Sequence, residues 1–251
     1  MSRPDKYSVL SAGSILGTLD RLEARVRERF PGRGLTHVCA ELGRIARVHV
    51  GRIDDVTRPH LLLRGMVALV LLAGLTAAGF GVDQKIRQLM VDPDEVMSFG
   101  GIEAIANILI LMGASVWFLL NLEARIKRAQ ALASLHELRS IAHVIDMHQL
   151  TKDPASLLGA GPTASSPERD LSPSDLMRYL DYCTEMLSLT GKLAALYMQS
   201  VRDEVVIHTV NEIEGLTTNL SSKMWQKIMI IRTEIDPAVS SILPGARAAQ
   251  A

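Results

Sequence analysis

The chain has 251 residues, and its 27 basic and 27 acidic side chains give a net charge of zero, which offers no basis for nucleic acid binding. Aromatic residues make up only 4% of the chain, whereas aliphatic residues are abundant, and this composition favours helices over strands. The two cysteines, Cys39 and Cys183, lack metal-site spacing and are too few for a disulfide framework.

The N-terminal region, residues 1–60, is predicted to form two amphipathic helices and no cleavable signal peptide, because its first thirty residues lack a long apolar core. Four arginines flank the apolar stripe of the first helix, so this helix could lie on an anionic membrane surface. Because acidic residues interrupt the basic face, we favour a solvated face packed on the rest of the protein. The two stripes contain Leu16, Leu19, Leu22 and Val26, and then Val38, Leu42, Ile45 and Ile53.

Two long uncharged runs follow, at residues 65–82 and 104–122. A bilayer core of roughly 30 Å needs about 20 apolar residues in helical conformation, and each run reaches this length with its flanks. We therefore predict transmembrane helices at 61–82 and 102–122, joined by a short external loop at 83–101. The alternative is a buried helical hairpin in a soluble protein.

The distribution of charge predicts the orientation of these spans. Residues 1–64 hold 12 Lys and Arg residues against 7 Asp and Glu, whereas the loop at 83–101 holds 2 against 4. Arg125, Lys127 and Arg128 follow the second span. Because basic residues remain on the cytoplasmic side, both termini are expected in the cytoplasm of a bacterial-type inner membrane protein.

Small and polar residues within the spans are candidates for helix packing. Gly74 and Ala78 are spaced by four residues, Gly113 lies in the second span, and Asn107 could hydrogen-bond between helices. Equally, small residues are simply common in membrane helices. A two-span hairpin buries little surface by itself, so we expect a homo-oligomer in the lipid bilayer.

The region after the spans is predicted to be helical and cytoplasmic. No Gly or Pro interrupts the chain between Ala114 and Pro154, so the second span should continue as a helical stalk over 123–152. A proline-rich stretch at 153–173 predicts a flexible linker, and Ser172 predicts the N-cap of the next helix. The final residues, 237–251, are expected to fray.

Residues 174–236 carry a long apolar stripe whose first part has heptad-like spacing. This pattern predicts a bundle or oligomer seam with coiled-coil character. Ser200 and Asp203 resemble a capping box, so a helical hairpin packed against the stalk is favoured over a single rod. The seam residues include Leu176, Leu180, Leu187, Leu216 and Leu220.

A histidine cluster in LHELRSIAHVIDMHQL, residues 135–150, is the strongest candidate for chemistry. His136 and His143 share a helix face but are separated by about 10.5 Å of helical rise, too far for one metal ion unless another helix contributes ligands. His143 and Asp146 are i, i+3 neighbours and could form an acid–base pair, although an exposed surface pair is the commoner outcome. We therefore expect no metal and no cofactor.

No motif for nucleophilic catalysis or phosphate binding is present, so an enzyme is not expected. The predicted fold is an all-α membrane protein, a two-span transmembrane hairpin with a cytoplasmic helical bundle. The predicted function is a non-enzymatic scaffold for oligomerisation, or for docking another membrane or cytoplasmic protein. The alternative is a signal-transducing or ion-conducting homo-oligomer, with Asn107 as a candidate pore residue.

Overall fold

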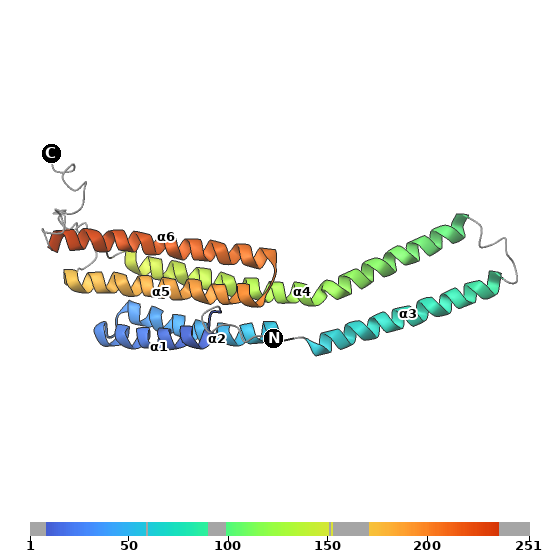
Figure 1. Cartoon of the computed structure of the whole chain (residues 1–251), viewed down its shortest axis with the longest axis horizontal. Coiled ribbons are helices and arrows are strands. Elements are labelled where there is room, and N and C mark those ends of the chain that lie inside the picture. Colours follow the sequence, from blue (N-terminus) through green and yellow to red (C-terminus); the bar gives the residue numbers. More distant parts are fainter. Residues whose placement is uncertain (1–8, 59, 90–98, 151, 153–170, 236–251) are drawn as a thin grey trace, which may run out of the picture. The chain divides into compact units, whose positions relative to one another are not determined.

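The computed structural model describes residues 9–58, 60–89, 99–150, 152 and 171–235, and these residues form helices without any strand (Figure 1). The all-helical fold predicted from the sequence is therefore confirmed, and so is the helical bundle. The helices are α1 (Ala12–Arg29), α2 (Gly34–Thr57), α3 (Leu61–Leu89), α4 (Phe99–Leu150), α5 (Pro173–Ser200) and α6 (Glu204–Ile235).

The chain divides into two compact units, which are described separately. Residues 1–57 and 131–251 form the first, here called the bundle unit, and residues 58–130 form the second, here called the hairpin unit. Helix α4 contributes to both, because it continues without interruption from Phe99 to Leu150.

Polar residues define where α1 begins and how it turns into α2. Ser11 is the N-cap of α1, and its side chain accepts a hydrogen bond from the backbone N–H of Ser14. After α1, Gly32 adopts a left-handed conformation with φ of 70°, which a residue with a Cβ atom adopts only with strain. The Thr36 hydroxyl then donates to the carbonyl of Phe30 over 2.5 Å. These contacts place α2 antiparallel beside α1.

The two C-terminal helices form a hairpin. Ser172 caps α5 by accepting from the backbone N–H of Asp175 over 3.1 Å, with Pro173 as the first helical residue. The chain leaves the helix after Ser200, and Asp203 caps α6 by accepting from the N–H groups of Val205 and Val206. The predicted capping box was therefore wrong in detail: Asp203 is itself the N-cap, whereas the Ser200 hydroxyl bonds back to Leu196.

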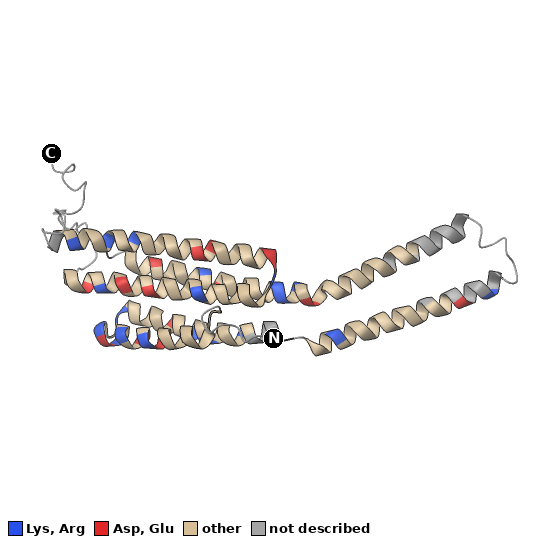
Figure 2. Ribbon diagram, viewed as in Figure 1, with Lys and Arg blue, Asp and Glu red and all other residues tan. Residues whose placement is uncertain are grey.

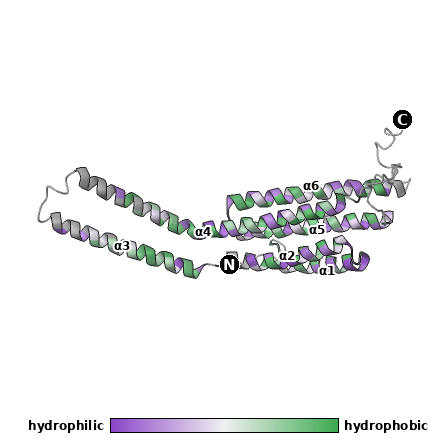
Figure 3. Cartoon of the chain, turned by 180° about the vertical axis from the view of Figure 1, so that it is seen from behind, coloured by the Kyte–Doolittle hydropathy of each residue, from purple (hydrophilic) through white to green (hydrophobic). Residues whose placement is uncertain are grey.

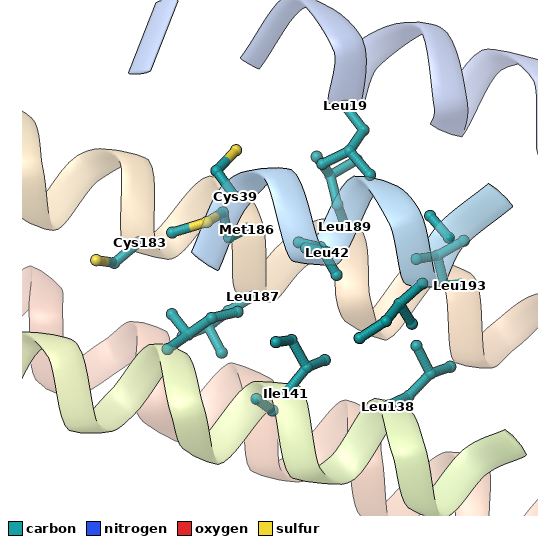
Figure 4. Close-up of a cluster of buried hydrophobic side chains, with 14 of the residues drawn as sticks. Leu19, Cys39, Leu42, Leu138, Ile141, Cys183, Met186, Leu187, Leu189 and Leu193 are labelled. Atoms are coloured by element: carbon teal, nitrogen blue, oxygen red, sulfur yellow. The ribbon is translucent and has the colours of Figure 1, made fainter. Parts of the chain in front are cut away.

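The core of the bundle unit is formed by apolar side chains from all five of its helical segments (Figure 4). Leu19 of α1, Leu42 of α2, Leu138 of α4 and Leu187 of α5 are completely buried there. Burial of this kind, with side chains from several helices in contact, is typical of protein interiors. In the close-up, Cys39 and Cys183 lie at one end of the cluster, on either side of Met186.

The basic side chains of α1 pack against the bundle. Arg25 pairs with Glu185, and Arg29 pairs with Asp175 over 3.0 Å, so both arginines contact α5. These contacts support the interpretation that α1 is a solvated helix packed on the protein.

The hairpin unit consists of α3 and the first part of α4, and on α3 the coloured charges lie toward the two ends of the helix (Figure 2). The first part of α3 is largely hydrophobic (Figure 3). Helix α3 continues to Leu89 and α4 begins at Phe99, so helix occupies both ends of the connection expected at 83–101. The reason is that no Gly or Pro follows Asp83 before Pro93, and Arg87 pairs with Asp83 one turn away over 2.9 Å.

Parts of the remaining expectations lie outside the described residues. These are most of the predicted linker at 153–173, all of the predicted tail at 237–251, and the centre of the loop at 83–101.

Candidate functional site

The histidine cluster lies on the part of α4 that belongs to the bundle unit. His136 and His143 are exposed, whereas the opposite face of the helix, including Leu135 and Leu138, is buried. Among the residues that the structure describes, no group of three or more His, Cys, Asp or Glu side chains is placed to hold a metal ion. His148, the third histidine, contacts α2, where a Cβ atom at Gly34 would lie 2.9 Å from its imidazole carbon.

Asp146 takes part in a different interaction from the one proposed. Its carboxylate accepts a hydrogen bond from the amide nitrogen of Gln149 over 2.7 Å. The amide oxygen of Gln149 in turn accepts from Lys227 of α6 over 2.8 Å, and Gln149 is almost fully buried. Asp146 therefore helps to orient a polar link between α4 and α6.

The structure brings together a different polar cluster, here called the His49 network. The Nδ1 atom of His49 lies 3.0 Å from the hydroxyl of Tyr197, and its Nε2 atom lies 3.1 Å from the carboxylate of Glu137. The same carboxylate oxygen accepts from Arg52 over 2.8 Å. Ser134 also hydrogen-bonds Tyr197. Helices α2, α4 and α5 are joined at this point.

The positions of the protons follow from the donors and acceptors available. Burial lowers the pKa of His49 by more than the hydrogen bond that His49 donates to Glu137 raises it, so the imidazole is neutral at pH 7. Burial raises the pKa of Glu137, but hydrogen bonds from Arg52 and His49 outweigh this effect, and the group is a carboxylate. A carboxylate can only accept, so His49 carries its proton on Nε2 and accepts from Tyr197 at Nδ1.

The burial of the network limits what it can do chemically. The side chains of His49 and Tyr197 are both completely buried, and only the Glu137 and Arg52 end reaches solvent. A general base must come within hydrogen-bond reach of its substrate. The network is therefore suited to fixing the relative register of three helices. It contains the residue types of a catalytic relay, but the buried His49 is out of reach of a substrate.

His49 is not among the site residues expected from the sequence, although its position in the pattern contains a signal. Leu42, Ile45 and Ile53 belong to the predicted stripe of the second helix, and His49 lies at the vacant position between Ile45 and Ile53. A histidine on an apolar stripe is expected to be buried, and a buried imidazole needs hydrogen-bond partners. The partners could not be identified from the sequence, because Glu137 and Tyr197 are 88 and 148 residues away from His49 and reach it only through tertiary packing.

A second feature of the bundle unit is an open groove of about 740 Å³ between the start of α1, α5 and α6. Many hydroxyl groups line it, together with Asp181, Lys192 and the half-exposed Trp225. Several hydroxyls donate to carbonyls of their own helix, as Thr184 does to Asp181 over 2.7 Å. They therefore present mainly acceptors to anything that enters the groove.

The hairpin unit contains an ionic cluster centred on Glu123. Its carboxylate accepts from Arg64 over 2.7 Å and pairs with Lys127 over 3.0 Å, and it lies 3.5 Å from the backbone nitrogen of His60. Hydrogen bonds from Arg64 and Lys127 lower the pKa of Glu123 to about 2. The cluster joins the start of α3 to α4.

The residues proposed for packing within the spans have few contacts inside this chain. A Cβ atom added at Gly74 or Gly113 would meet no other heavy atom within 4 Å, and Asn107 is exposed. The side chain of Ala78 lies outside the description. The close approach that small residues permit is therefore not used between α3 and α4 at these two glycines.

The predicted seam lies inside the bundle unit. Leu180, Leu187 and Leu220 are buried in its core, and Leu176 and Leu216 are partly buried against it. These five leucines thus pack within one chain.

Comparisons with protein-family models, with curated proteins and with solved structures find no match for this chain.

Proposed function

We propose that the chain is a non-enzymatic integral membrane protein that crosses a bacterial-type inner membrane twice. The observation that carries the proposal is the apolar surface of α3. The segment Leu61–Gly81 has a mean hydropathy of 2.1 and is the one helix among the described residues that is long and apolar enough to cross a membrane. None of it is buried within the protein. A core helix of a soluble protein would be covered.

Exposed side chains on α4 support the second crossing at 102–122. Leu109, Ile110, Trp117 and Leu120 are each more than half exposed. Large apolar side chains that are exposed together on one helix are typical of contact with lipid or protein. The surplus of basic residues before α3, and the three basic residues Arg125, Lys127 and Arg128 directly after the second span, support cytoplasmic termini.

The bundle unit is proposed to act as a platform for self-association or for docking a membrane or cytoplasmic protein. The imidazole of His49 and the hydroxyl of Tyr197 are buried, which argues against catalysis at this network. Its surface offers the groove between α1, α5 and α6, with Trp225 about half exposed at the edge. Aromatic residues of this kind are enriched in interfaces.

The membrane proposal is tested by alkaline extraction of membranes from cells that express the full chain. The wild-type protein should stay in the pellet. Leu72→Arg places a charge near the middle of the apolar segment and should disfavour insertion by roughly 2.5–3.5 kcal/mol, so that soluble or degraded protein increases. Trp225→Arg, a matched change at an exposed residue of the bundle unit, should leave the pellet fraction unchanged. Release of the wild-type protein by alkali would refute the proposal.

A signal-transducing role is the second candidate, and the continuity of α4 favours it. One helix of 52 residues contains the proposed second span and the stretch that carries Leu138 and Ile145 into the bundle core. A helix that belongs to both units offers a continuous path by which a change in span packing would reach the bundle. Inserting two alanines after Gln130 would rotate one part against the other by about 200°. A signalling role predicts that this insertion abolishes any partner response while the protein remains in the membrane.

A further inference from the structure

The hairpin unit holds a small pocket at the end where α3 begins. It has a volume of about 450 Å³ and is lined by His60, the three leucines at 61–63 and Ile126. The wall is therefore mostly apolar, and Leu61 and Leu62 are among the most exposed apolar side chains of the protein. A purely polar ligand would gain little from such a wall.

His60 contributes a polar group that lacks a partner. Its backbone nitrogen lies 3.5 Å from Glu123, but its imidazole Nε2 atom is buried and has no hydrogen-bond partner among the described residues. It is the one side-chain atom in the described part of the chain with this property. Because buried polar atoms are nearly always hydrogen-bonded, this nitrogen is a candidate for binding a polar group of a ligand.

The surroundings of the pocket are positively charged. Within residues 58–72 and 116–130 there are five basic side chains and one acidic side chain, Glu123. Arg64 and Lys127 both bind Glu123, so this carboxylate is already neutralised. Arg125 lies over the ring of Phe118 at 5.7 Å, and Arg58 and Arg128 are exposed. An anionic group is therefore favoured beside the pocket.

We infer that this end of the hairpin unit binds an anionic phospholipid, with its headgroup phosphate among His60 and the arginines and its upper acyl region against the leucines at 61–63. The inference rests on the proposed membrane location. An amphiphile accounts for the apolar wall, the unpaired nitrogen and the positive charge together. A free phosphate would leave the apolar wall unused, and a zwitterionic lipid would carry a second, repelled charge.

The experiment uses the full chain purified in a neutral detergent. Short-chain phosphatidylglycerol, phosphatidylcholine of the same chain length, and glycerol 1-phosphate are titrated, and binding is followed by native mass spectrometry and by the rise in Tm. Phosphatidylglycerol should bind most tightly. The double variant Arg125→Gln with Arg128→Gln should weaken its binding about 25-fold, since each arginine near an anionic surface contributes roughly fivefold.

Two controls make the result specific. Arg44→Gln with Arg47→Gln removes the same charge from α2 of the bundle unit and should leave lipid binding unchanged. His60→Leu should preserve the helical circular dichroism but reduce the rise in Tm caused by phosphatidylglycerol, whereas His136→Asn should not. Equal binding of phosphatidylcholine, equal binding of glycerol 1-phosphate, or an equal loss in both arginine pairs would overturn the inference. Since the wild-type protein would still resist alkaline extraction in these cases, failure here is distinct from failure of the membrane proposal.

Discussion

The hydroxyl of Tyr197 lies 3.0 Å from Nδ1 of His49, although the two residues are 148 positions apart in the sequence. Both side chains are completely buried, and their rings meet edge to face at 5.8 Å between centroids. This contact joins α2 to α5, and Glu137 extends it to α4. At the position of His49, hydrogen bonds therefore hold helices α2, α4 and α5 together in addition to apolar packing.

Tyr197→Phe should destabilise the protein. The substitution keeps the ring but removes the donor, so that Nδ1 of His49 remains buried and unsatisfied, with an expected loss of about 1–3 kcal/mol in the free energy of unfolding. Urea unfolding in a mild detergent, followed by circular dichroism, measures this difference. Tyr182→Phe is the control, because the described residues provide no hydrogen bond to the Tyr182 hydroxyl. Equal effects of the two substitutions would contradict the role of the His49 network.

The stability of the bundle should also depend on pH through His49. Burial lowers the pKa of His49 in the folded state, so below about pH 6.5 the unfolded chain binds a proton that the folded chain does not. The stability that neutral His49 contributes is fully present above about pH 6.5. It is lost as the pH falls, by up to about 1.4 kcal/mol per pH unit, until the pKa of His49 in the folded state is reached. Tyr197, Glu137 and Arg52 are the titratable groups that face His49, and the lowered pKa of Glu137 adds a similar loss only below about pH 4.5.

The measurement is unfolding free energy between pH 7.5 and pH 5.0. Wild-type protein should lose stability in this interval, and His49→Gln should be less stable at pH 7.5 but nearly independent of pH. If the unfolding free energy of the His49→Gln variant depends on pH as steeply as that of the wild-type protein, the pH dependence comes from other histidines.

The same residues show how far sequence reasoning can reach. The stripes of α1 and α2, the N-cap at Ser172 and the break near residue 200 all follow from local patterns, and the structure contains each of them. The His49 network could not be predicted, because three residues far apart in sequence have to converge. In the opposite direction, the proximity of His136, His143 and Asp146 in sequence suggested a site, but the two histidines face solvent and Asp146 binds Gln149.

Helix ends were harder to predict than helices. Asp203, not Ser200, caps α6, and this shift places Val206 in the core while Val205 is exposed. The long α3 was underestimated, because hydropathy marks where apolar residues end and not where the helix ends. Continued backbone hydrogen bonding and the pair of Asp83 with Arg87 carry α3 on to Leu89.

The apolar seam predicts a large effect at Leu187. This side chain of α5 is completely buried and points toward α4 (Figure 4), so Leu187→Ala should reduce the free energy of unfolding by about 2–5 kcal/mol through lost burial and a residual cavity. Met147→Ala, at a residue that is two-thirds exposed, should change it by less than about 0.5 kcal/mol. A small loss at Leu187 in denaturant unfolding would mean that the bundle is packed differently.

Both cysteines should be unreactive in the folded protein. Burial raises the pKa of Cys39 to about 12, and burial likewise raises the pKa of Cys183. Since the thiolate is the reactive form, a maleimide at pH 7 should modify neither residue within minutes, and both after denaturation in urea. Rapid modification of the native protein, detected by intact-mass measurement, would show that this end of the core opens readily.

Because the two native cysteines are expected not to react, an introduced cysteine can test the central proposal, the two-span topology, most directly. Ser98→Cys places a thiol in the connection between α3 and α4, and Ser222→Cys places one on the exposed surface of α6. Intact cells expressing each variant are treated with a membrane-impermeant maleimide before and after permeabilisation of the inner membrane. The proposal predicts that Ser98→Cys is labelled in both conditions and Ser222→Cys only after permeabilisation. Protection of both thiols until the inner membrane is permeabilised would contradict it.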